Sequence, residues 1–124
     1  MHVRGTIEFE IREKTADYVL AEMPIQPGIL NPFGVVNAGA ILGFADVAAS
    51  VLLMDAAHDQ TGMSGFPLAI NLNANLIGNQ REGTFTARAV VVKRGRTVSV
   101  VHTEVRGAGD KLIADLTSNH VLSK

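Results

Sequence analysis

The sequence predicts an α+β fold in which one long helix lies across a strongly curved antiparallel sheet of about six strands. Three observations lead to it. The segment from residue 37 to about residue 57 is almost entirely apolar and has the length of a helix. The segments around it alternate apolar and polar residues, and the last connections are short and contain glycine. The 124 residues fit one domain, 1–124, with a single core.

Six segments have strand patterns. They span residues 4–12, 18–25, 69–77, 84–93, 96–106 and 111–122. In the first, Ile7, Phe9 and Ile11 share one parity, which is typical of a half-buried strand. We expect the second to pair with the first, and the last three to form an antiparallel meander.

The strand predicted over residues 69–77 has an unusual polar face. Asn71, Asn73 and Asn75 alternate with the apolar residues Ile70, Leu72, Ala74 and Leu76. Three carboxamides in a row indicate a polar cleft, a subunit seam or a solvated face.

The predicted helix carries one carboxylate, Asp46, near its middle. No Lys or Arg occurs between residues 15 and 80, so this half of the sequence offers no cation to neutralise it. Burying an unpaired carboxylate costs several kcal/mol. Asp46 therefore either faces a polar cleft or is a buried acid, and both are typical of residues that do chemistry. The same carboxylate, in an apolar run of only 17 residues, favours a buried core helix over a membrane span.

Small residues accompany this carboxylate along the helix. At 100° per residue, Gly39, Gly43, Asp46 and Ser50 fall in a stripe about 60° wide. The bulky residues lie away from it and are expected to pack: Ile41, Phe44, Val47, Val51 and Leu52. The stripe lets a second chain or a ligand approach the helix. Close packing of the helix on its sheet would also explain the glycines, but it would not explain Asp46.

The composition excludes several classes. The net charge of −1 argues against nucleic-acid and anionic-membrane partners. The absence of cysteine excludes disulfides and thiolate chemistry. The charged, alternating N-terminus does not resemble a signal peptide, and we expect a cytoplasmic protein.

The sequence motifs do not indicate a metal site or a serine hydrolase either. His2, His58, His102 and His120 lack ligand spacing, and His58 near Asp55 or Asp59 is typical of surface polar groups. We expect no metal. There is no Gly-X-Ser-X-Gly elbow.

The run from Asn31 to Asp46, NPFGVVNAGAILGFAD, resembles the signature of hotdog-fold acyl-CoA thioesterases. The phenylacetate-pathway thioesterases and the Arthrobacter-type 4-hydroxybenzoyl-CoA thioesterases are the most similar groups. Their pattern has an Asn or Gln, a His-Gly-Gly that opens the central helix, and an Asp or Glu about two turns further on. Residues 90–98 also resemble that superfamily. This chain departs from the pattern at residues 37–39, which read Asn-Ala-Gly.

The resemblance implies roles for individual residues. Asp46 becomes the catalytic carboxylate, as nucleophile or as general base for water. The backbone N–H of Ala38 donates to the thioester carbonyl, Asn31 orients water or substrate, and Ser50 supports the carboxylate. The substrate-binding positions are Asn37, Gly39 and Asn73. A helix N-terminus supports the role of Ala38 independently, because its unpaired N–H groups stabilise a developing oxyanion.

The resemblance also implies partners. The substrate is a small or aromatic acyl-CoA, no cofactor is needed, and the chain forms a homodimer or a homotetramer built as a dimer of dimers, with each site at a seam. Some of the basic residues Arg88, Lys93, Arg94 and Arg96 would meet the phosphates of coenzyme A; a solvated turn is the alternative. Two other functions stay open: an enoyl-CoA hydratase or dehydratase of the same fold, and a non-catalytic acyl-CoA-binding protein.

Overall fold

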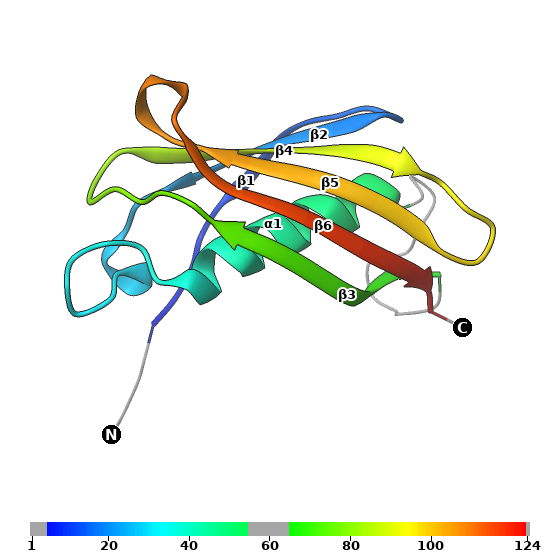
Figure 1. Cartoon of the computed structure of the whole chain (residues 1–124), viewed down its shortest axis with the longest axis horizontal. Coiled ribbons are helices and arrows are strands. Elements are labelled where there is room, and N and C mark those ends of the chain that lie inside the picture. Colours follow the sequence, from blue (N-terminus) through cyan, green and yellow to red (C-terminus); the bar gives the residue numbers. More distant parts are fainter. Residues whose placement is uncertain (1–4, 55–64, 124) are drawn as a thin grey trace.

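The structure, a computed structural model, describes residues 5–54 and 65–123. One helix lies across the concave face of a six-stranded antiparallel sheet (Figure 1). The strands are β1 (Glu10–Lys14), β2 (Tyr18–Pro24), β3 (Pro67–Leu76), β4 (Thr84–Lys93), β5 (Ser99–Arg106) and β6 (Leu112–Leu122). The helix is α1 (Ala38–Leu53), and the short 3-10 turns are η1 (Pro27–Ile29) and η2 (Ala108–Asp110). The sheet order is β1-β2-β4-β5-β6-β3. The predicted fold class, the pairing of the first two strands and the C-terminal meander are confirmed.

The first strand differs from its prediction over residues 4–12. It begins only at Glu10 and continues to Lys14, and all five of its residues are exposed. The residues before it are held differently: the side chain of Gln26 accepts from the Glu8 N–H and donates to the Glu8 carbonyl. At Glu8, hydrogen bonds to the Gln26 side chain thus take the place of hydrogen bonds to a neighbouring strand. Of the apolar residues expected to face the core, Phe9 contacts it, with its ring edge-on to that of Phe44 at a centroid distance of 5.2 Å.

The core lies between α1 and the concave face of the sheet. Phe44 of α1 and Phe85 of β4 are its largest fully buried side chains. Beneath the helix, Ala21, Ala87 and Ala89 are completely buried. Because these side chains are small, the helix can lie close to β2 and β4.

Both ends of α1 are fixed by polar contacts. Asn37 is the N-cap: its Oδ1 accepts from the Ala40 N–H at 2.7 Å. At the other end, the ammonium of Lys14 donates to the carbonyls of Val51, Leu52 and Met54 at 2.7–3.2 Å. Unpaired carbonyls at a helix C-terminus attract such a cation. The helix ends at Leu53, because Met54 after it has an extended backbone, so the predicted end near residue 57 is wrong.

The open side of α1 is close to the predicted stripe but not identical to it. Gly39 is exposed, and Gly43 and Asp46 are half-buried, as a stripe open to approach requires. Ser50 is only 6 % exposed. Val47, which we assigned to the packing side, is 39 % exposed, so that assignment is wrong. The sheet covers less of the helix circumference than the apolar pattern implied.

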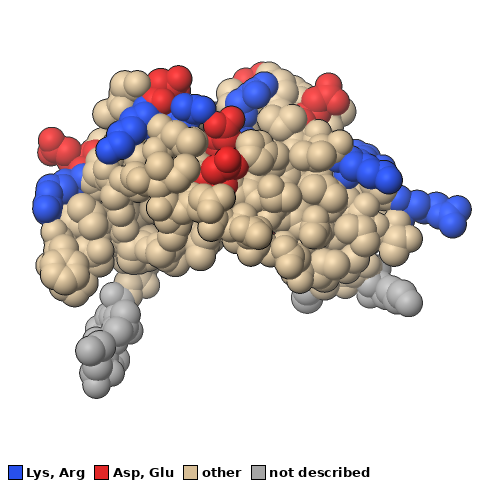
Figure 2. Space-filling view, viewed as in Figure 1, with Lys and Arg blue, Asp and Glu red and all other residues tan. Residues whose placement is uncertain are grey.

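The two edge strands differ in chemistry. Four of the five residues of β1 are charged, whereas β3 has no charged residue. Figure 2 shows charged side chains gathered over the upper part of the molecule, while the lower part, where β3 lies in Figure 1, is bare of them. Leu72 and Ala74 of β3 pack against the core, but Ile70 and Leu76, which share their parity, are 59 % and 47 % exposed. Charges normally protect a free edge from pairing, and β3 lacks that protection.

Candidate functional site

The start of α1 presents unpaired backbone donors. The first N–H groups of a helix have no intrahelical acceptor. At this end the Ala40 N–H is taken by the Asn37 side chain, but no described residue accepts from the N–H of Ala38 or Gly39. Both residues are exposed. Together with the positive end of the helix dipole, these groups can hold a carbonyl oxygen that becomes negative.

A pocket of about 310 Å³ lies beside these donors. Its walls are residues 5–7, residues 28–30 and the first turn of α1, including Gly39. The N-terminal segment approaches η1 so closely that a Cβ at Gly28 would stand 2.2 Å from the Thr6 carbonyl oxygen. Only glycine at position 28 therefore allows the two segments of this pocket wall to lie so close together.

Asp46 lies two turns further along the open side of α1. Its Oδ1 is buried and has no hydrogen-bond partner among residues 5–54 and 65–123. A buried acceptor left unpaired costs about 1–3 kcal/mol, and more when it is charged. Nothing lies within 4 Å of a Cβ placed on Gly43, so the helix surface before Asp46 is open. The carboxylate therefore has an unmet hydrogen-bonding capacity beside a surface that a second molecule can reach.

The separation of the two groups limits what one chain can do. Ala38 and Asp46 are eight residues apart on one helix, which is roughly 12 Å along its axis. A reacting group must approach within about 3–3.5 Å of its target. A carbonyl held by Ala38 is therefore out of reach of Asp46 in the same chain.

Asn31 has a structural task in the loop before the helix. Its Oδ1 accepts from the N–H groups of Phe33 at 2.9 Å and Val35 at 3.2 Å. The side chain thus closes the turn over residues 31–35. No described residue accepts from its Nδ2. A role of that group toward water or substrate stays a prediction.

The other predicted site residues lie in three different settings. Asn37 uses both ends of its carboxamide, since its Nδ2 donates to the Ile29 carbonyl at 2.9 Å. Ser50 is one turn after Asp46, as expected, and buried. Asn73 is exposed on β3, opposite Thr117 of β6. Their contacts with substrate stay predictions.

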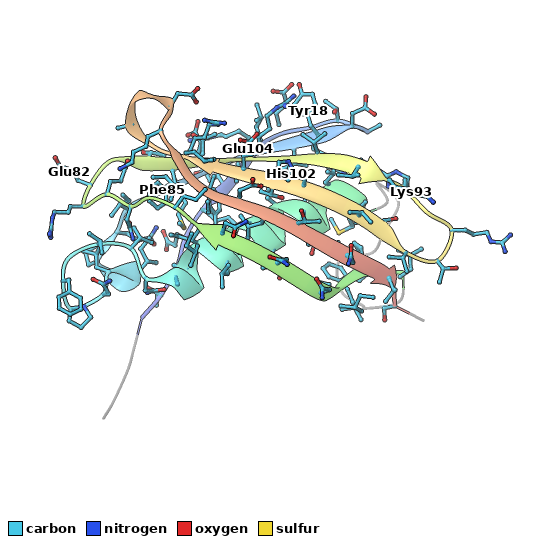
Figure 3. All side chains as sticks on the ribbon, viewed as in Figure 1. Tyr18, Glu82, Phe85, Lys93, His102 and Glu104 are labelled. Carbon is cyan, nitrogen blue, oxygen red and sulfur yellow. The ribbon has the colours of Figure 1, made fainter. Side chains whose placement is uncertain are left out.

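The four predicted coenzyme A contacts do not form one cluster. Arg88 lies on the outer face of the sheet, its guanidinium 5.2 Å from the Tyr18 ring centre. Lys93, Arg94 and Arg96 lie at the end of β4 and in the following turn, and Figure 3 shows Lys93 near that turn. Five strand positions, roughly 17 Å, separate Arg88 from Lys93.

The outer face around Arg88 has its own electrostatics. The Tyr18 hydroxyl donates to the Glu13 carboxylate at 2.5 Å, and this hydrogen bond raises the pKa of Tyr18. A groove of about 420 Å³ on this face joins Arg88 to Glu104, Arg106 and Asp110. Cations and acids alternate there, so the groove is no simple phosphate site.

Two residues of the β3–β4 loop were missed by the sequence analysis. The side chain of Asn79 accepts from the Val36 N–H and donates to the Val36 carbonyl, at 3.1 and 2.8 Å. Arg81 donates to the Phe33 carbonyl at 2.6 Å. These contacts join positions more than forty residues apart, so no local pattern could have indicated them.

The described part of the chain offers no metal centre and no membrane helix. No three His, Cys, Asp or Glu side chains in residues 5–54 and 65–123 are placed to hold an ion. His58, Asp55 and Asp59 lie outside the described residues. None of the described helices has the length and apolar character needed to cross a bilayer.

Comparisons with known proteins point to one family. The model of the thioesterase superfamily matches residues 33–114. ComA2, a candidate esterase of Bacillus subtilis, is 33 % identical over 104 residues, covering 84 % of this chain and 80 % of that protein. A crystal structure of a thioesterase from Haemophilus influenzae is 25 % identical, with a TM-score of 0.79, and the match covers 91 % of this chain and 76 % of that one.

A third relative is a thioesterase from Staphylococcus aureus. A variant with a glutamate replaced by alanine is 25 % identical to this chain, with a TM-score of 0.85 and 94 % of each chain covered. A second variant of it has a glutamine replaced by alanine.

Proposed function

Because the chain belongs to the thioesterase superfamily and is a thioester hydrolase, we propose that it hydrolyses a small or aromatic acyl-CoA with Asp46 as the catalytic carboxylate. The observation that carries the proposal is the buried, unpartnered Oδ1 of Asp46 beside the open surface of α1. A carboxylate oxygen without a partner is free to accept a proton or to attack a carbonyl.

The proposed reaction takes place between two chains. The N–H of Ala38 in one chain holds the thioester carbonyl, and Asp46 of a second chain acts on it. As a general base, Asp46 takes a proton from water, the hydroxide adds to the carbonyl carbon, and the tetrahedral intermediate expels the coenzyme A sulfur. The proton on Asp46 then neutralises that sulfur. As a nucleophile, Asp46 adds to the carbonyl carbon, the C–S bond breaks, and coenzyme A leaves as a thiolate that takes a proton from solvent. Water then cleaves the mixed anhydride, which releases the acid and restores the Asp46 carboxylate.

The second chain is proposed to join at β3. β3 contains no charged residue, Ile70 and Leu76 are exposed on it, and Val47 is exposed on the nearby helix. Pairing of β3 with β3 of a second copy around a two-fold axis would extend the sheet and cover these side chains. A two-fold also aligns the helices in opposite directions, which is the arrangement that can bring Ala38 of one chain toward Asp46 of the other.

The spacing of the site residues agrees with a relative. In the Staphylococcus aureus thioesterase, the glutamine and the glutamate replaced by alanine are fifteen positions apart. Asn31 and Asp46 are also fifteen positions apart. This supports a common site in which an amide residue of the loop and a carboxylate of the helix act together.

Replacement of Asp46 by asparagine tests the proposal. Asparagine keeps the size of the side chain but cannot take a proton, so turnover of acyl-CoA esters should fall by roughly a thousandfold. Release of free thiol from a panel of acyl-CoA esters measures it and identifies the acyl group. Asp17→Asn, which changes an exposed acid in the β1–β2 turn, is the matched control and should retain full activity.

Three results would contradict the proposal. Unchanged hydrolysis by the Asp46→Asn protein would remove Asp46 from the mechanism. Hydration of crotonyl-CoA without thiol release would indicate the hydratase function. Tight acyl-CoA binding in calorimetry without any hydrolysis would indicate a binding protein.

A further inference from the structure

We propose that Phe33 and Arg81 form the subsite for the 3′-phosphoadenosine end of coenzyme A. The inference rests on the proposed acyl-CoA hydrolysis and identifies where the substrate's nucleotide is held. It differs from the sequence-based assignment, in which some of Arg88, Lys93, Arg94 and Arg96 meet the phosphates.

Phe33 is the most exposed large apolar side chain in the described part of the protein, at 78 %. Single exposed apolar residues are common and usually need no explanation. Phe33 differs because the loop that carries it is held by several hydrogen bonds from side chains. An aromatic ring that is held in place and left in solvent is suited to contact a ligand at little conformational cost.

The loop is fixed by side chains from two sides. Asn31 accepts from two of its N–H groups, and Asn79 clamps Val36 at its end through both atoms of its carboxamide. Arg81 donates to the carbonyl of Phe33 itself. The guanidinium also lies against Gly34, where an added Cβ would stand 2.7 Å from its Nη1. Gly34 has φ +84°, so both space and backbone conformation favour glycine there.

Arg81 supplies the complementary charge. None of the ion pairs among the described residues involves it, whereas Arg12 and Arg106 are paired with acids. Among the described residues, only the Phe33 carbonyl accepts a hydrogen bond from its five N–H donors. The guanidinium is bonded to the backbone of the residue that carries the exposed ring. Together, its free donors and the ring match a phosphate that accepts hydrogen bonds and a purine that stacks.

The position of the loop fits the substrate. Phe33 lies five residues before Ala38, whose N–H holds the carbonyl in the proposed reaction. In Figure 1 the loop after η1, the start of α1 and the β3–β4 connection lie at one end of the molecule. Lys93 lies toward the other end in Figure 3. Within one chain, the loop is thus the nearer place for a nucleotide joined to the thioester by the pantetheine arm.

Truncated substrates test the subsite. Phe33→Leu removes the ring but keeps an apolar side chain, and it should raise KM for acyl-CoA roughly tenfold with kcat nearly unchanged. Phe33→Trp should retain the wild-type KM. The same acyl group on N-acetylcysteamine, which lacks the nucleotide, should be hydrolysed equally by all three proteins. Val92→Ala, at an exposed position of β4, is the control for loss of an apolar side chain.

The phosphate contact has a separate test. Arg81→Gln should raise KM for acyl-CoA but leave KM for the acyl-dephospho-CoA close to that of the wild type. Adenosine 3′,5′-bisphosphate should compete with acyl-CoA in the wild type and lose this effect in Phe33→Leu. Equal hydrolysis of the N-acetylcysteamine thioester by Arg81→Gln would show that the loop and the Ala38 amide remain in place.

Several outcomes would overturn the subsite. These are an unchanged KM in Phe33→Leu, equal losses with the truncated thioester, or a smaller oligomer in sedimentation, which would make Phe33 a subunit contact. A raised KM in the Lys93→Ala, Arg94→Ala, Arg96→Ala protein, with no effect at Phe33, would place the nucleotide at the β4–β5 turn. Each of these four outcomes would contradict the nucleotide subsite but not the proposed hydrolysis by Asp46. An active Asp46→Asn protein would contradict the proposed hydrolysis by Asp46 but not the subsite.

Discussion

Asn37 combines two tasks at the entrance of α1, at the position where the thioesterase signature that the sequence resembles has histidine. Its Oδ1 caps the helix and its Nδ2 ties the helix start to Ile29. A carboxamide cannot transfer a proton at neutral pH, but it can perform both of these contacts at once. The residue therefore holds the start of α1 in place, and in the proposed mechanism the proton transfer is assigned to Asp46.

Two substitutions of Asn37 separate stability from catalysis. Asn37→Ala removes the cap and should lower the free energy of unfolding by about 1 kcal/mol, measured by denaturant titration. Asn37→Asp keeps a capping oxygen, so it should be nearer to the wild type in stability. It places a negative charge beside the developing oxyanion, however, and should lower kcat for thiol release by more than Asn37→Ala does. Equal kcat in both variants would show that the cap is remote from the reacting carbonyl.

At the scale of elements, α1 depends on contacts that its own sequence does not contain. Its last turn has no basic residue, and the cation that binds its carbonyls comes from Lys14 at the end of β1. Val36, two residues before the helix begins, is held by the side chain of Asn79, 43 positions away in sequence. The helix is therefore placed by the strands and loops around it, and its position relative to a second chain depends on them.

Removal of the Lys14 ammonium tests this dependence. Lys14→Met keeps the aliphatic stem but loses the charge-assisted hydrogen bonds to the helix carbonyls. The free energy of unfolding should fall by about 1–2 kcal/mol. Lys93→Met, at an exposed strand end, is the matched control and should stay within about 0.5 kcal/mol of the wild type. A Lys14→Met protein as stable as that control would mean that water satisfies these carbonyls equally well.

At the scale of the whole molecule, the proposed reaction needs two copies of the chain. The amide donors and the carboxylate are too far apart on one helix, and the β3 edge and the open side of α1 face away from the core. These features agree with the proposed pairing of two copies at β3. Activity and assembly should therefore be lost together.

A double substitution on β3 tests the link. Ile70→Lys with Leu76→Lys adds two charges to the free edge, at side chains that a single chain leaves exposed. Sedimentation velocity should show a smaller species, circular dichroism should show retained strand and helix, and thiol release should fall to background. The matched control is Val92→Lys with Val98→Lys, also at exposed positions. An active monomer of the β3 variant would contradict a site shared between chains.

The sequence by itself determined the elements and their order. Local patterns carry that information, because alternation, a long apolar run and glycine-bearing turns act within a few residues. The motif from Asn31 to Asp46 likewise predicted the family, since its residues are close in sequence. The errors lie where distant contacts contribute: the Gln26 side chain bonds the backbone of Glu8 in place of a strand, and Lys14 binds the carbonyls at the end of the helix.

Only the tertiary structure decided which surfaces stay open. It placed Arg88 on the outer face of the sheet against the Tyr18 ring, seventy positions away in sequence, whereas the other three cations lie at the end of β4 and in the turn after it. It also brought Arg81 to Phe33 across forty-eight positions, which no local pattern encodes. Burial and long-range contact depend on how the whole chain packs, so the unpaired Oδ1 of Asp46 became visible only there.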